Sequence, residues 1–556
     1  MVESRNKVTN TGGWVRCWSL GLLLASFVLC QAAQANELLR RRMESILAGY
    51  PVAAAGETLL ATKALPRFYD QRQYELAWSA PLLWQAMLDA IDQVAADGLQ
   101  PEDYHRTPLA RLLAQASDQP GGLTEAQRID LDLLLTDAFL VLGSHLLDGK
   151  VNPETIDPEW VASRRQRDMV ASLDTALAND KVISTLTGFR PAQAGYQRLV
   201  DLRPKFRRLL ETAWPPLALT PSIRPQQTDP RVPEVRQRLE LLGDLSAMTE
   251  TSYADEVYGD DLQSAVMRFQ SRHGLEPDGI LGKDTFAALN YSPQQRLDQL
   301  DVNLERWRWL PDDLGDTYVM VNIAGFELEL VAQGQVVERH RVVVGRSYRR
   351  SPVFSDQIRY LVFNPTWTVP FKLMVQDKLP EILQDPDYLN RLGFTVYKGW
   401  GEKRQQVDPA TIDWASLSAR YFPYQLVQEA GPRNALGQIK FMFPNKFNVY
   451  LHDTPSKELF QKTDRSFSSG CIRVENPVAL AERLLAGTPG WNPDRIRSVL
   501  HTGEGQTVYL QEPVPVHLQY WTAWLDANGA LQFRKDIYDR DARLLSALRV
   551  HSRDLR

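Results

Sequence analysis

Two short runs decide how this chain is interpreted: residues 450–454 are YLHDT and residues 468–474 are SSGCIRV. A thiol is a poor nucleophile until it is deprotonated, and a neighbouring imidazole both accepts its proton and stabilises the thiolate. A glycine before the cysteine allows the tight backbone bend that aims successive N–H groups at a developing oxyanion. Cys471 is therefore the candidate nucleophile. His452, which lies at the end of a predicted strand, is the candidate base.

The composition is that of a soluble protein with several domains. The chain has 556 residues, of which 44% are hydrophobic and 24% charged, a balance typical of globular proteins. This excludes disordered, collagen-like and integral membrane proteins. Because a single hydrophobic core stops growing at about 250–300 residues, we expect more than one domain. The net charge of −5 and the lack of a Lys/Arg-rich block argue against a nucleic-acid partner.

Residues 1–35 have the pattern of an export signal. Basic residues in the first 16 positions precede an apolar run over 18–29, which is followed by an A-x-A site at 33–35. The run is shorter than the roughly 20 residues needed to span a bilayer. We expect cleavage after Ala35. An uncleaved anchor, with peripheral membrane association, is the alternative.

Cleavage would leave a single cysteine. Cys17 and Cys30 would be removed, and only Cys471 would remain, in a compartment where unpaired thiols are exposed to oxidation. Such a cysteine is either a buried apolar filler or a nucleophile, and without its neighbours both interpretations are open.

Residues 36–225 are predicted to form a helical scaffold domain. Apolar residues at i, i+3 and i+4 spacings predict one helix near 82–97, ended by Gly98, and a second helix is predicted over about 125–148, ended by Gly149. The segment has no compact sequence cluster of Cys, His and carboxylate residues. We therefore interpret it as structural, with a partner-binding surface as the alternative.

Residues 226–292 follow a proline-rich linker and are predicted to form three short helices. Positions 265–285 carry the pattern A-V-x-x-F-Q-x-x-x-G-L-x-x-D-G-x-x-G-x-x-T, with glycines where helices must end. The pattern resembles the three-helix peptidoglycan-binding module. A helical spacer that keeps the fold but has lost the ligand groove is the alternative.

After Trp309 the spacing of apolar residues changes from a helical period to the alternation of apolar and polar residues that is typical of strands. Strands are predicted over 318–323, 326–331 and 336–345, with further strands at 358–363 and 447–451, so residues 293–556 form a β-rich domain. An insertion over about 374–432 is predicted to be a lid or a decoration. Within about 508–538, strands 514–518 and 531–533 are predicted to form a hairpin around Asn528-Gly529.

Four stretches together resemble one family, the L,D-transpeptidase (YkuD) domain of large periplasmic proteins of Gram-negative bacteria. They are residues 450–455, 468–475, 364–370 (NPTWTVP) and the tail 520–538. The resemblance implies a multidomain α+β fold, with a helical scaffold, a three-helix peptidoglycan-binding module and a β-rich catalytic domain that carries an inserted lid. Commoner members of the family have a second histidine before the Gly-Cys pair, where this chain has Ser469.

The resemblance implies an acyl transfer between peptidoglycan stem peptides. Cys471 would attack the carbonyl of the third residue of a donor tetrapeptide stem and release the terminal D-alanine. The side-chain amine of a second stem would resolve the thioester and give a 3→3 cross-link. The enzyme would be a periplasmic transferase of cell-wall organisation and cell shape and a target of carbapenems, with stem peptides and glycan as its partners.

The resemblance also implies the roles of the residues around Cys471. His452 would act as base and then as acid. The backbone N–H groups of Gly470 and Cys471 would bind the oxyanion, with Ser469 assisting.

Three further residues are candidates for substrate binding. Arg473 would pair with a substrate carboxylate through its planar fork, with a structural salt bridge as the alternative. Tyr450 and Trp367 would line the pocket, with aromatic core as the alternative for both. Asp453 is adjacent to His452, so on a strand it would face the other way, and we expect a backbone carbonyl to orient the imidazole instead.

Two other functions stay open. The same Cys–His pair would serve an L,D-carboxypeptidase or an endopeptidase, because water and an amine compete for one acyl-enzyme. A non-catalytic wall-binding scaffold would require the Cys–His loop to be vestigial. We propose no cofactor and no metal site, since the sequence has no H-E-x-x-H motif and no paired ligand spacing. The sequence specifies neither the acceptor, nor protein partners, nor the oligomeric state.

Overall fold

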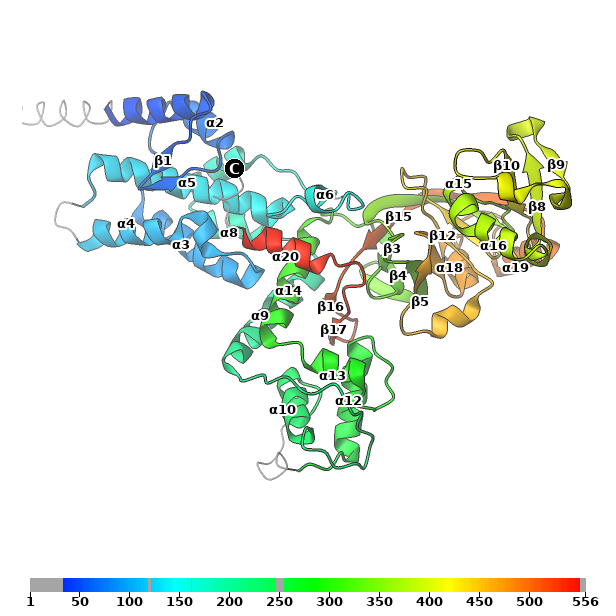
Figure 1. Ribbon diagram of the computed structural model, residues 1–556. Coiled ribbons are helices and arrows are strands. Elements are labelled where there is room, and N and C mark those ends of the chain that lie inside the picture. The colour runs from blue at the N-terminus through cyan, green and yellow to red at the C-terminus, as the bar shows by residue number, and fades with distance from the viewer. Residues whose placement is uncertain (1–33, 119–121, 162, 247–254, 551–556) are drawn as a thin grey trace, which may run out of the picture. The chain divides into compact units, whose positions relative to one another are not determined.

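The computed structural model describes residues 34–118, 122–161, 163–246 and 255–550 (Figure 1). The predicted export signal therefore lies almost entirely outside the described residues. Within these ranges, no helix is both long enough and apolar enough to cross a bilayer. The chain forms two compact units: residues 1–150, 165–193 and 546–556 belong to the first, and residues 151–164 and 194–545 to the second.

The first unit is helical and is organised around α5 (Glu125–Asp148), which matches the predicted helix. A capping box at Thr124 and Gln127 starts α5. Its neighbours include α2 (Ala64–Gln71), α3 (Pro81–Gln93), α4 (Arg106–Asp118), α7 (Met169–Ala178) and α8 (Val182–Thr187). The predicted helix near 82–97 is α-helical to Gln93 and tightens into a 3₁₀ turn, which Gly98 ends in the left-handed conformation.

Two buried carboxylates on α5 tie loops of the first unit to this helix. Asp132 accepts the N–H groups of Ala77 and Trp78, both at 2.8 Å. Asp137 accepts the N–H of Ala61 at 2.7 Å and contacts the buried imidazole of His105. Because backbone donors occupy these oxygens, the cluster holds loops in place, which agrees with the structural interpretation of this segment.

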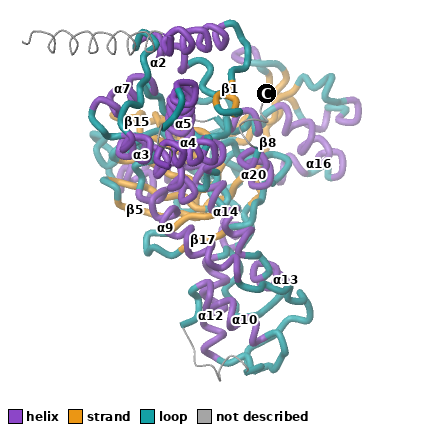
Figure 2. The backbone as a smooth tube through the Cα atoms, turned by 90° about the vertical axis from the view of Figure 1, so that its left-hand side faces the viewer, coloured by secondary structure: helices purple, strands orange, loops and turns teal. Residues whose placement is uncertain are grey.

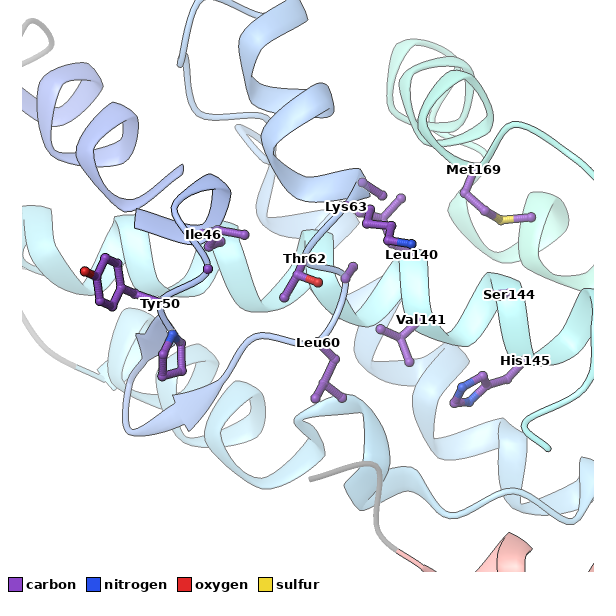
Figure 3. Close-up of a pocket in the computed structure, with 14 residues that line it drawn as sticks. Ile46, Tyr50, Leu60, Thr62, Lys63, Leu140, Val141, Ser144, His145 and Met169 are labelled. Carbon is purple, nitrogen blue, oxygen red and sulfur yellow. The ribbon is translucent and has the colours of Figure 1, made fainter. Parts of the chain in front are cut away.

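The first unit also has a pocket of about 730 Å³ beside α5 (Figure 3). Apolar side chains form much of its wall, with the Lys63 amine and the His145 imidazole among its polar groups. The pocket contains none of the seven residues selected from the sequence as site candidates.

The second unit contains the predicted three-helix module. Figures 1 and 2 show α10 (Val232–Leu242), α12 (Asp260–Arg272) and α13 (Lys283–Leu289) side by side. The Gln270 side chain links the module's turn, because its amide donates to Asp278 at 2.9 Å and Thr285 at 3.1 Å while its carbonyl accepts the Gly279 N–H at 2.9 Å. The recognised pattern in this module is thus a set of contacts that hold its fold.

A closed β-sheet forms the centre of the second unit. Within the described residues, nine strands lie in the order β13-β5-β14-β12-β11-β6-β15-β3-β4, and β4 also pairs with β5, so the sheet closes on itself. The strands are β3 (Thr317–Asn322), β4 (Glu327–Ala332), β5 (Gln335–Gly345), β6 (Phe354–Phe363), β11 (Ile439–Met442), β12 (Leu451–His452), β13 (Ser466–Ser468), β14 (Ile472–Val474) and β15 (Gln506–Gln519).

Two strand predictions in this domain were wrong. Of the strand predicted over 447–451, only Leu451 lies in a strand, β12. Residues 447–450 form a loop around Asn448, whose φ is +52°. The predicted hairpin partner 514–518 belongs to β15, which pairs with β3 and β6. The hairpin at Asn528-Gly529 instead joins β16 (Ala523–Leu525) to β17 (Leu531–Phe533), since a short turn can only connect strands close to it in sequence.

The insertion forms a small subdomain between β6 and β11. It has a four-stranded sheet in the order β7-β10-β8-β9, namely β7 (Trp367–Thr368), β8 (Phe394–Lys398), β9 (Gln405–Val407) and β10 (Tyr424–Gln428). Helical turns over 371–392 and an apolar core of its own complete it (Figure 1). Because β7 belongs to this sheet, the insertion is wider than the predicted 374–432. At its neck, the Asn364 N–H donates to Gln438 at 2.8 Å.

Candidate active site

Three neighbouring strands bring the candidate residues onto one face of the closed sheet. The parallel pair β12–β14 places His452 opposite Arg473, and the antiparallel pair β11–β12 places Lys440 opposite His452. Tyr450 and Cys471 directly precede β12 and β14, where the Ile472 N–H donates to the Tyr450 carbonyl at 3.2 Å. The intervening residues Leu451, Ile472 and Val474 are completely buried on the other face.

His452 is buried and has a defined tautomer. Its Nδ1 lies 2.5 Å from the backbone carbonyl of Asp453. A carbonyl only accepts hydrogen bonds, so Nδ1 carries the proton and Nε2 is left as the basic nitrogen. Burial, helped by the positive charge of Arg473, lowers the pKa of His452 to about 3. The imidazole is therefore neutral near pH 7.

Asp453 takes no part in orienting the imidazole through its side chain. Its carboxylate accepts the N–H of Gln438 at 2.9 Å and pairs with Lys457. The backbone carbonyl of Asp453 orients His452, as expected from the adjacent positions of the two residues.

Cys471 is half-buried, and several groups act on its thiol. Burial raises the pKa of the thiol, whereas a backbone hydrogen bond and a side-chain hydrogen bond from Tyr450 lower it, as do the charges of Lys440 and Arg473. The Tyr450 ring lies edge-on to His452, with the ring centroids 5.6 Å apart, and the Lys440 ammonium sits 3.9 Å from the centroid of the same ring. Lys440 was not among the residues selected from the sequence.

The loop before Cys471 is organised by Ser468. The Ser468 hydroxyl donates to the carbonyl of Cys471 at 2.5 Å and accepts the Gly470 N–H at 3.1 Å. Gly470 has a φ of +117°, a conformation that strongly favours glycine. The N–H of Gly470, predicted as an oxyanion donor, is thus engaged within the loop. The hydroxyl of Ser469 is exposed and accepts a hydrogen bond from Arg349 at 3.2 Å.

Comparisons with known families match three parts of this chain. Residues 63–202 match a family described as "Scaffold domain", residues 228–289 one described as "Putative peptidoglycan binding domain", and residues 316–491 the family YkuD, described as "L,D-transpeptidase catalytic domain". The chain carries a YkuD L,D-transpeptidase catalytic domain. This match contains both His452 and Cys471.

The chain is similar to one curated relative and to several solved structures, of which two are given below. A protein of Haemophilus influenzae named "Putative L,D-transpeptidase" is 37% identical over 246 residues, which are 44% of this chain and 48% of that protein. The chain therefore spans about half the length of this relative.

The first structure is of an L,D-transpeptidase from Xylanimonas cellulosilytica, with 18% identity, a TM-score of 0.18, and coverage of 55% of this chain and 99% of that chain. The second is of a fused Zn-dependent amidase/peptidase/peptidoglycan-binding domain-containing protein from Clostridium acetobutylicum, with 11% identity, a TM-score of 0.15, and coverage of 54% and 99%. At these TM-scores neither structure carries an argument about the fold.

Arg349 connects the insertion to the cysteine loop of the L,D-transpeptidase domain. It lies between β5 and β6, and its guanidinium holds both carboxylate oxygens of Asp377 on the insertion, one of them at 2.6 Å. The same guanidinium donates to Ser469. Bidentate pairs of this kind are geometrically specific, so Arg349 fixes the insertion relative to the loop that carries Cys471.

The remaining two candidates lie in different surroundings. Arg473 donates to Thr454 at 3.5 Å, its Nε is buried without a partner, and no carboxylate within the described part of the chain forms an ion pair with it. Its fork is thus available to a ligand of the L,D-transpeptidase domain. Trp367 lies in the core of the insertion, 6.1 Å from Phe394 between ring centroids. This packing agrees with the aromatic-core alternative, and a pocket-lining role for Trp367 stays a prediction.

Proposed function

We propose that this protein is a peptidoglycan L,D-transpeptidase that forms 3→3 cross-links through a thioester on Cys471. The observation that supports this most directly is the pairing of His452 with Arg473 on adjacent strands, with Tyr450 and Cys471 directly before them, within an L,D-transpeptidase catalytic domain. The export pattern at residues 1–35 supports action outside the cytoplasm, and the resemblance to large periplasmic proteins of Gram-negative bacteria makes their periplasm the proposed compartment.

The first half-reaction cleaves the donor stem. Nε2 of His452 takes the proton of the Cys471 thiol as sulfur attacks the carbonyl carbon of the third stem residue. The carbon–nitrogen bond to D-alanine breaks, and the imidazolium returns the proton to the leaving amine. Burial raises the pKa of the Cys471 thiol and lowers the pKa of the His452 imidazole, so both groups are neutral at rest and the proton moves when the substrate is in place.

The second half-reaction forms the cross-link. The side-chain amine of an acceptor stem attacks the thioester carbonyl, His452 removes a proton from that amine, and the Cys471 thiolate leaves. Lys440 and Arg473 stabilise the thiolate, since both lower the pKa of the Cys471 thiol. The planar fork of Arg473, which lacks an acidic partner in the described chain, binds a carboxylate of the donor stem.

The product decides between the functions that share this site. The protein, with the Cys471→Ala variant as the blank, would be incubated with purified disaccharide-tetrapeptide, and the muropeptides identified by mass spectrometry. Cross-linked dimers that lack one D-alanine, formed only by the wild type, are expected. Tripeptide monomers without dimers would instead identify an L,D-carboxypeptidase. Unaltered substrate would contradict both enzymes and favour the wall-binding scaffold.

Removing the insertion should affect the acceptor more than the fold. In this variant a short glycine linker replaces residues 366–432, which leaves the hydrogen bond between Asn364 and Gln438 at the neck. The insertion has its own core, so the closed sheet should remain folded and Cys471 reactive. The excision also removes Asp377, the partner of Arg349, and with it the contact that fixes the insertion beside the cysteine loop. We expect the acceptor stem to be poorly positioned without it. We expect cross-linking to fall on the order of 10²-fold, and D-alanine release to fall much less.

The control for this variant removes only β9, the edge strand of the insertion, over residues 405–407. It should keep most of the cross-linking activity. Insoluble protein after the larger excision would show that the insertion is part of the domain core, and equal losses of both activities would contradict a role in handling the acceptor.

A further inference from the structure

We propose that Ser351, held in place by Tyr538, is a positioning residue that sets the Cys471 N–H as the oxyanion donor. The inference rests on the proposed function, because it concerns the carbonyl that Cys471 attacks. Both residues are completely buried. Neither was among the residues selected as site candidates, although Tyr538 lies in the tail whose sequence resembles the family.

A closed set of hydrogen bonds connects Tyr538 to the cysteine loop. The Tyr538 hydroxyl donates to the carbonyl of Gly345 at 2.6 Å and accepts the N–H of Ser351 at 3.2 Å. The Ser351 hydroxyl accepts the N–H of Gly345 at 3.0 Å and donates to the carbonyl of Gly470 at 2.8 Å. Every polar atom of this set has a partner, so the set holds one arrangement.

The orientation of the Cys471 N–H follows from the geometry of the peptide bond. The Gly470 carbonyl and the Cys471 N–H belong to the same peptide group, which is planar and trans, so they point in opposite directions. Ser351 holds the carbonyl, and the N–H therefore points away from Ser351. Within the described chain no acceptor takes this N–H, whereas the N–H of Gly470 is engaged by Ser468. The Cys471 N–H is the free donor of the loop.

An aromatic and cationic stack keeps Tyr538 from moving. Its ring stacks on Tyr520, with centroids 5.4 Å apart and planes at 18°. The Arg540 guanidinium lies over both rings, 5.0 Å from Tyr538 and 5.1 Å from Tyr520, and pairs with the buried Asp157 at 2.6 Å. The tail motif thus acts as the support for the loop that carries the nucleophile, at a distance from the substrate.

Two electrophiles separate positioning from general damage to the site. Iodoacetamide reacts with a thiolate by displacement at a saturated carbon and needs no oxyanion donor, whereas a carbapenem acylates through addition to a carbonyl. The rate of each reaction at Cys471 would be measured by intact-mass spectrometry for the wild type, Ser351→Ala, Ser351→Thr and Tyr538→Phe. The control is Ser355→Ala, which removes a hydroxyl bound to His517 in the same sheet.

In Ser351→Ala and Tyr538→Phe, we expect acylation to slow by about 10- to 100-fold, somewhat less than the 10²–10³-fold loss typical of removing an oxyanion donor. Alkylation should change less than about twofold and keep its pH dependence, as should both reactions in the control. Ser351→Thr, which keeps the hydroxyl, should recover most of the acylation rate. If Ser351→Ala does not fold, Tyr538→Phe carries the test alone.

Two results would overturn the inference. Acylation of Ser351→Ala and Tyr538→Phe at the wild-type rate would show that the hydrogen-bonded set does not position the donor. Equal slowing of alkylation and acylation, together with a lower melting temperature, would show a structural role only. A wild-type protein that reacts with neither reagent at Cys471 would instead contradict the proposed function, so the two failures are distinguishable.

Discussion

The Cys471→Ala variant should fold like the wild type, form no cross-linked product and gain no mass from a carbapenem. Neither neighbouring serine is placed to replace the thiol, because Ser468 is bound within the loop and Ser469 faces Arg349. Loss of the nucleophile in other covalent acyl-transfer enzymes lowers kcat by about 10⁶-fold. The thiol is held by hydrogen bonds from Tyr450 and by a weak contact with the Asn448 carbonyl at 3.9 Å, so stability should fall by about 1 kcal/mol.

This result is checked by intact-mass spectrometry after incubation with a carbapenem and by melting temperature. The wild type should gain the mass of one carbapenem on Cys471. The control is Ser355→Ala, which removes a hydroxyl bound to His517 in the same sheet and should be acylated like the wild type. Product formation by Cys471→Ala at a rate near that of the wild type would rule out the thioester mechanism.

The His452→Gln variant should lose most of its turnover and also become less sensitive to acid. A positioned general base contributes about 10²–10⁴-fold to the rate, so we expect a loss in that range. The native protein keeps His452 neutral, since its pKa of about 3 lies far below the ordinary value of 6.5, whereas the unfolded chain takes up a proton below that value. The stabilisation is therefore fully present above pH 6.5 and is lost as the pH falls towards 3.

The size of the effect on stability follows from the two pKa values. At pH 4 the loss from His452 amounts to about 3 kcal/mol. The free energy of unfolding should be measured by chemical denaturation at pH 7 and at pH 4. Its drop between these two pH values should be smaller in His452→Gln than in the wild type by about this amount. A residual dependence should remain, because burial also lowers the pKa values of His273 and His517. His501→Gln, at an exposed histidine, is the control. A pH dependence equal to that of the wild type would contradict a neutral buried His452.

Sequence patterns identified the elements of this protein that depend on residues close to each other in the sequence. The helix over 125–148 was predicted with Gly149 at its end, and the structure has the same bounds. The insertion and the β-rich character of the domain were also predicted. The partner of His452 Nδ1 could be expected, since adjacent residues of a strand face opposite sides.

The sequence could not show what depends on strand pairing and long-range contacts. Lys440 lies beside the site only because β11 pairs with β12 in one register, and β12 is two residues long. Ser351 and Tyr538 meet across a separation of 187 residues. The misplaced hairpin has the same cause, because alternation in residues 514–518 predicts a strand but not its neighbours.

The contacts of Gln270 in the three-helix module bear on how such modules evolve. Substitution of Gln270 would leave the buried N–H of Gly279 without its acceptor, which is costly whether or not a ligand is bound. Selection for a folded chain alone would therefore preserve the pattern over many generations. A lineage could lose its affinity for glycan without any change at these positions, and the trace of that loss would lie in the exposed residues of the helices.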